Sequence, residues 1–144
     1  MSRSYKGDVS VEDCWAALQS DSDSFLIDVR TSAEWNFVGF PLVPETGHDA
    51  VFAEWQIYPS MAVDSAFAER VGGAIRAAGG SPSSRLYFLC RSGARSMSSA
   101  AAMTAAGFSE CFNILDGFEG PPNPEGHRGL VAGWKAAGLP WRQK

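Results

Sequence analysis

The chain has 144 residues, of which 45% are hydrophobic and 19% charged, a composition typical of one globular domain rather than of a disordered segment. Its 12 basic and 16 acidic residues give a net charge of −4 with no basic stripe, so neither nucleic acid nor an anionic membrane is an expected partner. No apolar segment approaches the roughly 20 residues that cross a bilayer. The first eight residues lack the apolar stretch of a signal peptide, which predicts a cytoplasmic protein.

Helical and strand patterns alternate through the first half of the chain. Ser10, followed by the acidic first turn of residues 11–13, is typical of a helix start. The apolar run 25–29 predicts a buried strand, and Thr31-Ser32-Ala33-Glu34 is a capping-box pattern that predicts a short helix. Residues 51–57 are interpreted as a strand, and the apolar spacing over 64–78 predicts a helix.

The second half continues this alternation. Residues 86–89 and 111–115 are short apolar runs that predict buried strands, and a helix is expected to begin at Ser96 between them. Residues 116–129 are rich in Gly and Pro and predict a loop, after which 130–137 are expected to form a last short helix. Strands alternating with helices indicate an α/β domain of three layers, with a central, mainly parallel sheet flanked by helices.

The loop Cys90-Arg91-Ser92-Gly93-Ala94-Arg95 joins a predicted strand to a predicted helix. Such a loop turns successive backbone N–H groups inward and places a helix N-terminus at the same point, which makes an anion site. Gly93 suits a backbone that needs unusual angles or a close ligand approach. A cysteine at the first position is expected to be held as a thiolate, so Cys90 is the candidate nucleophile.

The other two cysteines are expected to be structural. Cys14 falls on the apolar face of a predicted helix, and Cys111 begins a predicted buried strand. Only Cys90 stands at the carboxyl end of a strand, where α/β sheets place ligands. Three widely spaced cysteines suggest reduced thiols rather than a disulfide framework, and no Cys/His spacing suggests a metal site.

Polar residues of the loop have specific expected roles. Arg95 is expected to hold a tetrahedral anion with its bidentate fork, whereas Arg91 either lines the pocket mouth or points to solvent. Ser92 and Ser96 either hydrogen-bond the thiolate or cap the helix, and capping is the expectation for Ser96. Ala94 completes the cradle.

Asp28 ends a buried strand, where an unpaired carboxylate is costly. It is therefore expected to pair with a cation or to cap backbone N–H groups near the loop, in a supporting role. Arg30 is expected to form a scaffold ion pair with Glu34.

The six loop residues resemble the active-site loop of the rhodanese-like family, whose pattern is Cys-Arg-x-Gly-x-Arg/Thr. Leu26-Ile27-Asp28-Val29-Arg30 with Glu34-Trp35 is similar to the family's Asp-Val-Arg…Glu-Tyr/Trp segment. Asp116-Gly117-Phe118, and Trp134 with Gly138-Leu139-Pro140, are similar to its later motifs. The resemblance implies a single rhodanese-like domain over residues 8–142.

What the resemblance implies is sulfur transfer without a metal or organic cofactor. Thiolate Cys90 takes the outer sulfur of a donor such as thiosulfate, and the persulfide passes it to cyanide or a thiol, including a thiol-bearing protein. Related phosphatases and arsenate reductases have a loop one residue longer, Cys-x5-Arg. Phosphatase or arsenate reductase activity stays open as an alternative, although only four residues separate Cys90 from Arg95. A third alternative is a non-catalytic protein-binding module, whose usual signature is loss of the loop cysteine.

Two segments depart from the family pattern. Phe40-Pro41-Leu42-Val43-Pro44 stands where a His-Ile-x-Gly-Ala stretch is usual, and residues 119–129 look longer than usual. Segments 40–50 and 119–129 are both expected to border the pocket, which leaves the donor and acceptor open. His127 is interpreted as a surface residue, with proton transfer as the alternative.

Overall fold

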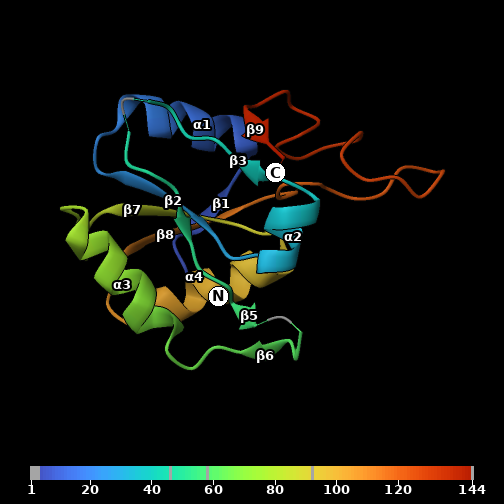
Figure 1. Ribbon diagram of the computed structural model, residues 1–144. Helices are drawn as coiled ribbons and strands as arrows, with labels where there is room; N and C mark the ends of the chain where they lie inside the picture. The colour runs from blue at the N-terminus through green and yellow to red at the C-terminus, as the bar shows by residue number, and fades with distance from the viewer. Residues whose placement is uncertain (1–3, 46, 58, 92, 144) are drawn as a thin grey trace.

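The computed structural model describes residues 4–45, 47–57, 59–91 and 93–143, and a five-stranded sheet forms its centre (Figure 1). Neighbouring strands are all parallel and lie in the order β1, β8, β7, β2, β4. Their bounds, in that order, are Gly7–Val9, Glu110–Ile114, Arg85–Leu89, Ser24–Asp28 and Val51–Phe52. The predicted α/β fold with a mainly parallel central sheet is confirmed.

Helices cover both faces of this sheet, as Figure 1 shows. In the described ranges the helices are α1 (Val11–Ser20), α2 (Ser32–Phe37), α3 (Phe67–Ala77) and α4 (Ala94–Ala105). Because side chains alternate along a strand, Phe25 and Ile27 of β2 pack into the cluster that includes residues of α3 and α4, whereas Leu26 packs into the cluster of α1. In the described part of the chain no helix has the length and apolar character to span a membrane.

Local sequence signals placed several helix starts correctly. Ser10 caps α1, and its hydroxyl accepts the Asp13 N–H. Thr31 and Glu34 form the predicted capping box of α2. The start of α4 was predicted two residues too late, because Gly93, with φ 121°, takes the N-cap position and allows the helix to begin at Ala94.

The expected strand over 51–57 is divided into two elements. β4 pairs with β2, but β5 (Gln56–Ile57) leaves the central sheet and pairs antiparallel with β6 (Ala62–Val63). Between them Trp55 turns its ring against Phe67 of α3, with ring centroids 5.1 Å apart. A second small antiparallel sheet joins β3 (Phe40–Pro41) to β9 (Trp141–Arg142).

The expected helix over 130–137 is wrong, because this segment forms turns. Gly133 has φ 99°, which a right-handed helix does not contain. The N–H groups of Trp134 and Lys135 donate to the carbonyls of Gly117 and Phe118 rather than within their own segment. Tertiary hydrogen bonds to the 117–118 turn thus take these two N–H groups, and the bond from the Ala137 N–H to the Gly133 carbonyl remains within the segment.

Candidate active site

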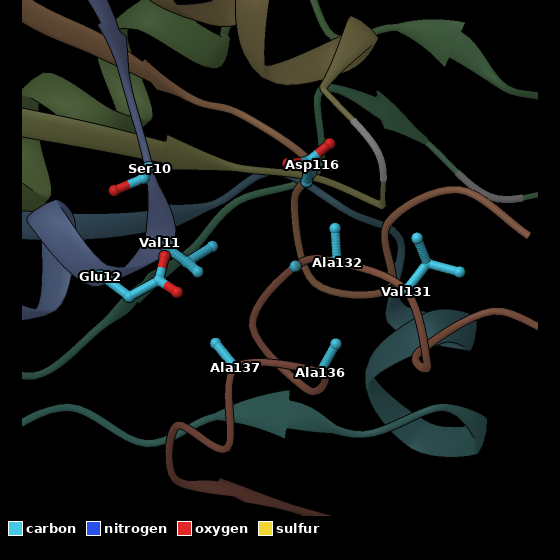
Figure 2. A pocket seen from close by; sticks show the side chains of 9 residues that line it. Ser10, Val11, Glu12, Asp116, Val131, Ala132, Ala136 and Ala137 are labelled. Atoms are coloured by element: carbon cyan, nitrogen blue, oxygen red, sulfur yellow. The ribbon is translucent and has the colours of Figure 1, made fainter.

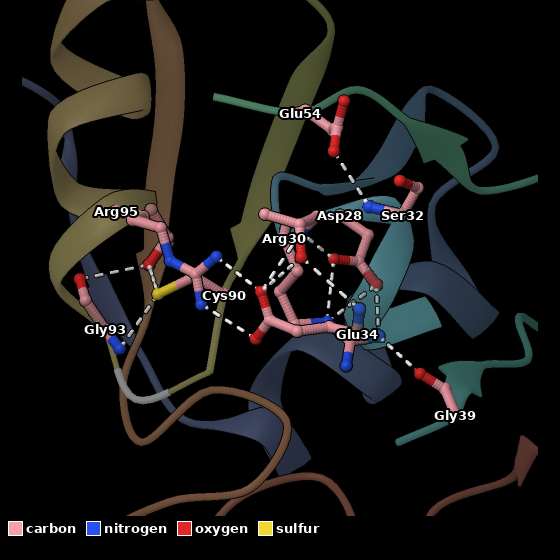
Figure 3. Close-up of polar contacts among 11 residues, drawn as sticks. Asp28, Arg30, Ser32, Glu34, Gly39, Glu54, Cys90, Gly93 and Arg95 are labelled. Atoms are coloured by element: carbon pink, nitrogen blue, oxygen red, sulfur yellow. Dashed lines mark hydrogen bonds and ion pairs between the residues drawn. The ribbon is translucent and has the colours of Figure 1, made fainter. Parts of the chain in front are cut away.

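Cys90 lies where β7 meets the loop before α4 (Figure 3). Its side chain is buried, with 1% exposure, and the Gly93 N–H donates to its Sγ at 3.0 Å. Cys90 also lies at the N-terminal end of the 12-residue helix α4, whose first residue is Ala94. An N–H donor and a helix N-terminus therefore both face the sulfur, an arrangement that stabilises negative charge.

The remaining loop residues surround this position. Arg91 is exposed, and its backbone carbonyl accepts the N–H groups of Glu119 and Gly120, both at 3.1 Å. Ala94 is exposed at the start of α4. Ser92, predicted as part of the cradle, lies outside the described residues.

Ser96 contacts the sulfur and does not cap α4, which corrects the expectation from sequence. Its Oγ lies 3.2 Å from Cys90 Sγ, 3.1 Å from the Gly93 carbonyl and 2.6 Å from Asn113 Oδ1. Asn113 Nδ2 donates to Asp8 Oδ1 at 3.0 Å, and because a carboxylate only accepts, Asn113 must present its oxygen to Ser96. The Ser96 hydroxyl therefore has two oxygen acceptors, Asn113 Oδ1 and the Gly93 carbonyl, besides its contact with Cys90 Sγ.

Arg95 does not keep its guanidinium fork free for an anion, contrary to the expectation. Arg95 Nη1 donates to Glu34 Oε1 at 2.6 Å, and Nη2 donates to Oε2 at 2.9 Å (Figure 3). The Thr31 N–H and hydroxyl each donate to Glu34 Oε1 at 3.1 Å. The Glu34 carboxylate thus completes the cap of α2 and also binds the guanidinium of Arg95, the last residue of the cysteine loop.

The two partners reinforce each other's charge. Burial alone raises the pKa of Glu34, but the hydrogen bonds and charge of Arg95, with the Thr31 N–H and the charge of Arg30, outweigh it and hold the pKa below its ordinary value. Burial lowers the pKa of Arg95, and the bonds and charge of Glu34 more than reverse this. The pair is therefore fully ionised at neutral pH.

The stabilisation from Glu34 is expected to disappear in acid. Its pKa is lower in the folded than in the unfolded chain, so its contribution is complete above the unfolded value of about 4.3 and is lost as the pH falls through the folded value. Glu34→Gln keeps a capping-box side chain but removes the charge. In urea denaturation from about pH 6 to about pH 3, the difference in unfolding free energy between wild type and Glu34→Gln should shrink. Glu69→Gln, exposed on α3, is the matched control, and a pH-independent difference for Glu34→Gln would contradict the expectation.

Asp28 and Arg30 form a fully buried ion pair, so the expected cation partner of Asp28 is confirmed. Arg30 Nη2 lies 2.8 Å from Asp28 Oδ2, and the Arg30 backbone N–H donates to Oδ1 at 3.1 Å. Nη2 also donates to the Gly39 carbonyl at 2.8 Å, and the guanidinium carbon lies 4.1 Å from the centre of the Phe118 ring. The expected Arg30–Glu34 ion pair is wrong, because Arg30 is committed to Asp28 and Glu34 to Arg95.

A cavity of about 380 Å³ opens beside the cysteine loop. It is lined by Glu34, Val38, Met61, Arg91, Arg95 and Glu119. Arg91 lines the cavity, which is one of the two alternatives expected for it, and it is also exposed. Glu119 belongs to segment 119–129, which was expected to border the pocket, whereas sequence reasoning did not identify Val38 or Met61, because their segments meet the loop only in the fold.

Cys14 and Cys111 are buried, as predicted. Each has 0% exposure, Cys14 in α1 and Cys111 in β8. Burial raises the pKa of Cys14 far above that of a free thiol and raises that of Cys111 to about 11, so both are held as thiols at neutral pH. Within the described ranges, no three His, Cys, Asp or Glu side chains gather into a group that suits a metal ion.

Comparison with known proteins agrees with this geometry. Residues 10–120 match the model of the rhodanese-like domain. The chain belongs to the rhodanese-like family. Uncharacterised proteins of Rickettsia conorii and Rickettsia rickettsii are 36% and 35% identical to this rhodanese-like chain over 125 residues. Each alignment covers 87% of this chain and 88% of the relative.

Two solved structures share the rhodanese-like fold. The crystal structure of Rv0390 from M. tuberculosis superposes with a TM-score of 0.84 at 40% identity, covering 97% of this chain and 99% of the other. The polysulfide-sulfur transferase homodimer from Wolinella succinogenes superposes with a TM-score of 0.57, covering 98% and 80% of the two chains. At 18% identity, the second likeness concerns the fold alone.

The two segments that depart from the family pattern have different positions in this rhodanese-like domain. Segment 119–129 reaches the cavity beside the cysteine loop through Glu119, whereas His127 is exposed. The described residues of segment 40–50 line separate cavities, including one of about 570 Å³ beside Trp15 and Pro140, and none of them lines the cavity beside the cysteine loop.

A further cavity of about 250 Å³ lies between the start of α1 and residues 131–137 (Figure 2). Its walls carry mostly small side chains, with Glu12 and Asp116 as the acidic groups. None of the described residues that line it is a cysteine.

Proposed function

We propose that this rhodanese-like domain is a sulfurtransferase in which Cys90 carries the transferred sulfur as a persulfide. The observation that carries the proposal is the Gly93 N–H, held 3.0 Å from Cys90 Sγ inside a loop with four residues between Cys90 and Arg95. A loop this short suits one sulfur atom better than a phosphate group. The neighbour of the same fold that is named a polysulfide-sulfur transferase is consistent with this chemistry.

The reaction consists of two displacements at sulfur. In the first, the Cys90 thiolate forms a bond to the donor's outer sulfur while the donor's own bond to that sulfur breaks, and the leaving group departs with the bonding electron pair. From thiosulfate the leaving group is sulfite. In the second, cyanide or a thiolate takes the outer sulfur and returns the electron pair to Cys90. The product is thiocyanate or a new persulfide.

The protein's contribution is electrostatic and positional. The Gly93 N–H and the N-terminus of α4 stabilise the negative sulfur before attack and again when it leaves. β7 and α4 hold the two ends of the loop. Neither displacement needs a metal or an organic cofactor.

Phosphate or arsenate chemistry is less well supported by the same site. Hydrolysis of a phosphate ester requires a cationic fork on the equatorial oxygens. Here both terminal nitrogens of Arg95 already bind Glu34. Sulfur transfer makes no such demand on Arg95.

Intact-mass spectrometry tests the proposal directly. Wild type treated with a sulfane donor should gain about 32 Da, the mass of one sulfur, on the peptide that contains Cys90. Cys90→Ser should gain none and should lose all sulfur transfer to cyanide. Cys14→Ala and Cys111→Ala, which remove buried structural thiols, should keep the adduct.

Two results would contradict sulfur transfer. One is an adduct that persists in Cys90→Ser. The other is the absence of any adduct after treatment with thiosulfate, methanethiosulfonate and cysteine persulfide. In the second case, a protein partner captured equally by wild type and Cys90→Ala would favour a non-catalytic binding module.

A further inference from the structure

The walls of the cavity beside the cysteine loop, which Arg91 and Arg95 of that loop line, carry balanced charges. Arg91 and Arg95 contribute two positive charges, and Glu34 and Glu119 contribute two negative ones. Building on the proposed sulfur transfer, we propose that the Cys90 site takes sulfur from donors with at most one negative charge, such as alkyl persulfides, and discriminates against the dianion thiosulfate.

The first observation is that Arg95 is not available to a second anion. Its two terminal nitrogens bind the two oxygens of Glu34, and both side chains are only 18% exposed. Glu34 is itself held by the Thr31 N–H and hydroxyl. A dianionic donor that bound the guanidinium of Arg95 would leave the partly buried Glu34 carboxylate without its cation, which costs free energy.

The second observation is that Glu119 is anchored to the cysteine loop by its backbone. Its N–H donates to the Arg91 carbonyl at 3.1 Å, and its carbonyl accepts the Gly129 N–H at 2.7 Å. Its side chain lines the cavity that Arg91 also lines. Because Arg91 is exposed, solvent and salt weaken its attraction for an anion.

Neighbouring cations do not restore a positive cavity. Arg30 is neutralised by Asp28 in a pair with 0% exposure. Lys135 does not itself line the cavity; its Nζ donates to the Val38 carbonyl at 3.1 Å, lies 4.1 Å from the centre of the Trp141 ring and interacts with the charge of Glu119. The described side chains that line the wall therefore carry no net charge to bind the second charge of thiosulfate.

A persulfide donor matches this environment. The Cys90 thiolate attacks the outer sulfur of R–S–SH, a new S–S bond forms, the donor S–S bond breaks and R–S⁻ leaves with the electron pair. The total charge is one negative charge before and after the step. Val38 and Met61 offer apolar contact to an alkyl group on the same walls.

The test compares donors that differ in charge. Methanethiosulfonate has one negative charge and thiosulfate two, and both carry the transferable sulfur on an oxidised sulfur atom. The rate of the Cys90 adduct is measured for both donors and for cysteine persulfide by quenched mass spectrometry. Each rate is divided by that of the same donor with 2-mercaptoethanol, an uncharged thiol. After this correction the singly charged donors should react at least about tenfold faster than thiosulfate at low salt.

Removing either carboxylate should relax this selectivity. Glu34→Gln, which frees Arg95, should raise the ratio of the thiosulfate rate to the persulfide rate about tenfold, and Glu119→Gln should raise it about threefold. Glu69→Gln removes the same charge from an exposed position on α3 and should change neither rate. Glu119→Gln keeps the test informative if Glu34→Gln fails to fold.

Two results would overturn the proposed selectivity. The first is a corrected rate for thiosulfate that equals or exceeds that for methanethiosulfonate. The second is a ratio of the two rates that stays unchanged in both Glu34→Gln and Glu119→Gln. Either outcome, with a Cys90 adduct present, rejects the selectivity alone. The absence of an adduct from every donor rejects the proposed sulfur transfer itself.

Discussion

Replacing Asp28 with alanine is expected to lower the free energy of unfolding by about 3–5 kcal/mol, because it leaves the Arg30 guanidinium buried without its counter-charge. Both side chains have 0% exposure. A loss of this size is a large part of the roughly 5–15 kcal/mol that stabilises a typical domain. Urea denaturation at neutral pH measures it, and a loss below about 1 kcal/mol would contradict the importance of the pair.

The double variant Asp28→Leu with Arg30→Met separates the charge from the packing. It removes both charges and keeps apolar volume against the Phe118 ring, on which Arg30 now stacks. Among the described residues, Arg30 Nη1 has no hydrogen-bond partner, so the pair is incompletely satisfied. The double variant should therefore be more stable than Asp28→Ala. If it were less stable, specific geometry rather than charge balance would dominate.

Gly117→Ala is expected to destabilise the domain by about 2–4 kcal/mol and to disturb the Cys90 loop. Gly117 has φ 62°, a conformation that alanine adopts at a cost. Its added Cβ would also lie 2.6 Å from the carbonyl carbon of Arg91 and against the carbonyl oxygen of Cys90. Because both contacts are with loop backbone, relief requires the loop to move. Urea denaturation and the rate of the Cys90 adduct should both register the change.

Gly138→Ala is the matched control for this substitution. Gly138 has φ 75°, close to that of Gly117, but no atom lies within 4 Å of an added Cβ. Its cost should be limited to the backbone strain of about 1–2 kcal/mol. Adduct formation should be unchanged. Equal effects of the two substitutions on the adduct rate would show that contact with the loop is unimportant.

Local signals predicted the frame of the domain well. The capping residues Ser10 and Thr31 stand where the sequence pattern placed them, because a cap depends on residues three positions away. The apolar runs 86–89 and 111–115 were also predicted from local sequence, and they form most of β7 and β8. A strand buried on both faces of a parallel sheet needs a continuous apolar run, which is visible in the sequence.

Segments whose structure depends on distant partners were predicted less well. Residues 130–137 contain helix formers, but the N–H groups of Trp134 and Lys135 donate to the carbonyls of Gly117 and Phe118. Residues 51–57 were divided because Trp55 packs on α3. In both cases a tertiary contact outweighed a weak local preference.

The sequence by itself determined the parallel α/β fold, the family and the identity of Cys90 as the candidate nucleophile, since each depends on short-range patterns. Only the tertiary structure decided what surrounds the sulfur. Arg95 meets Glu34 across 61 positions, and Asn113 meets Asp8 across 105. These pairings depend on which strand ends and helix starts meet at one edge of the sheet. This arrangement sets the charge of the cavity and the hydrogen-bond partners of Ser96.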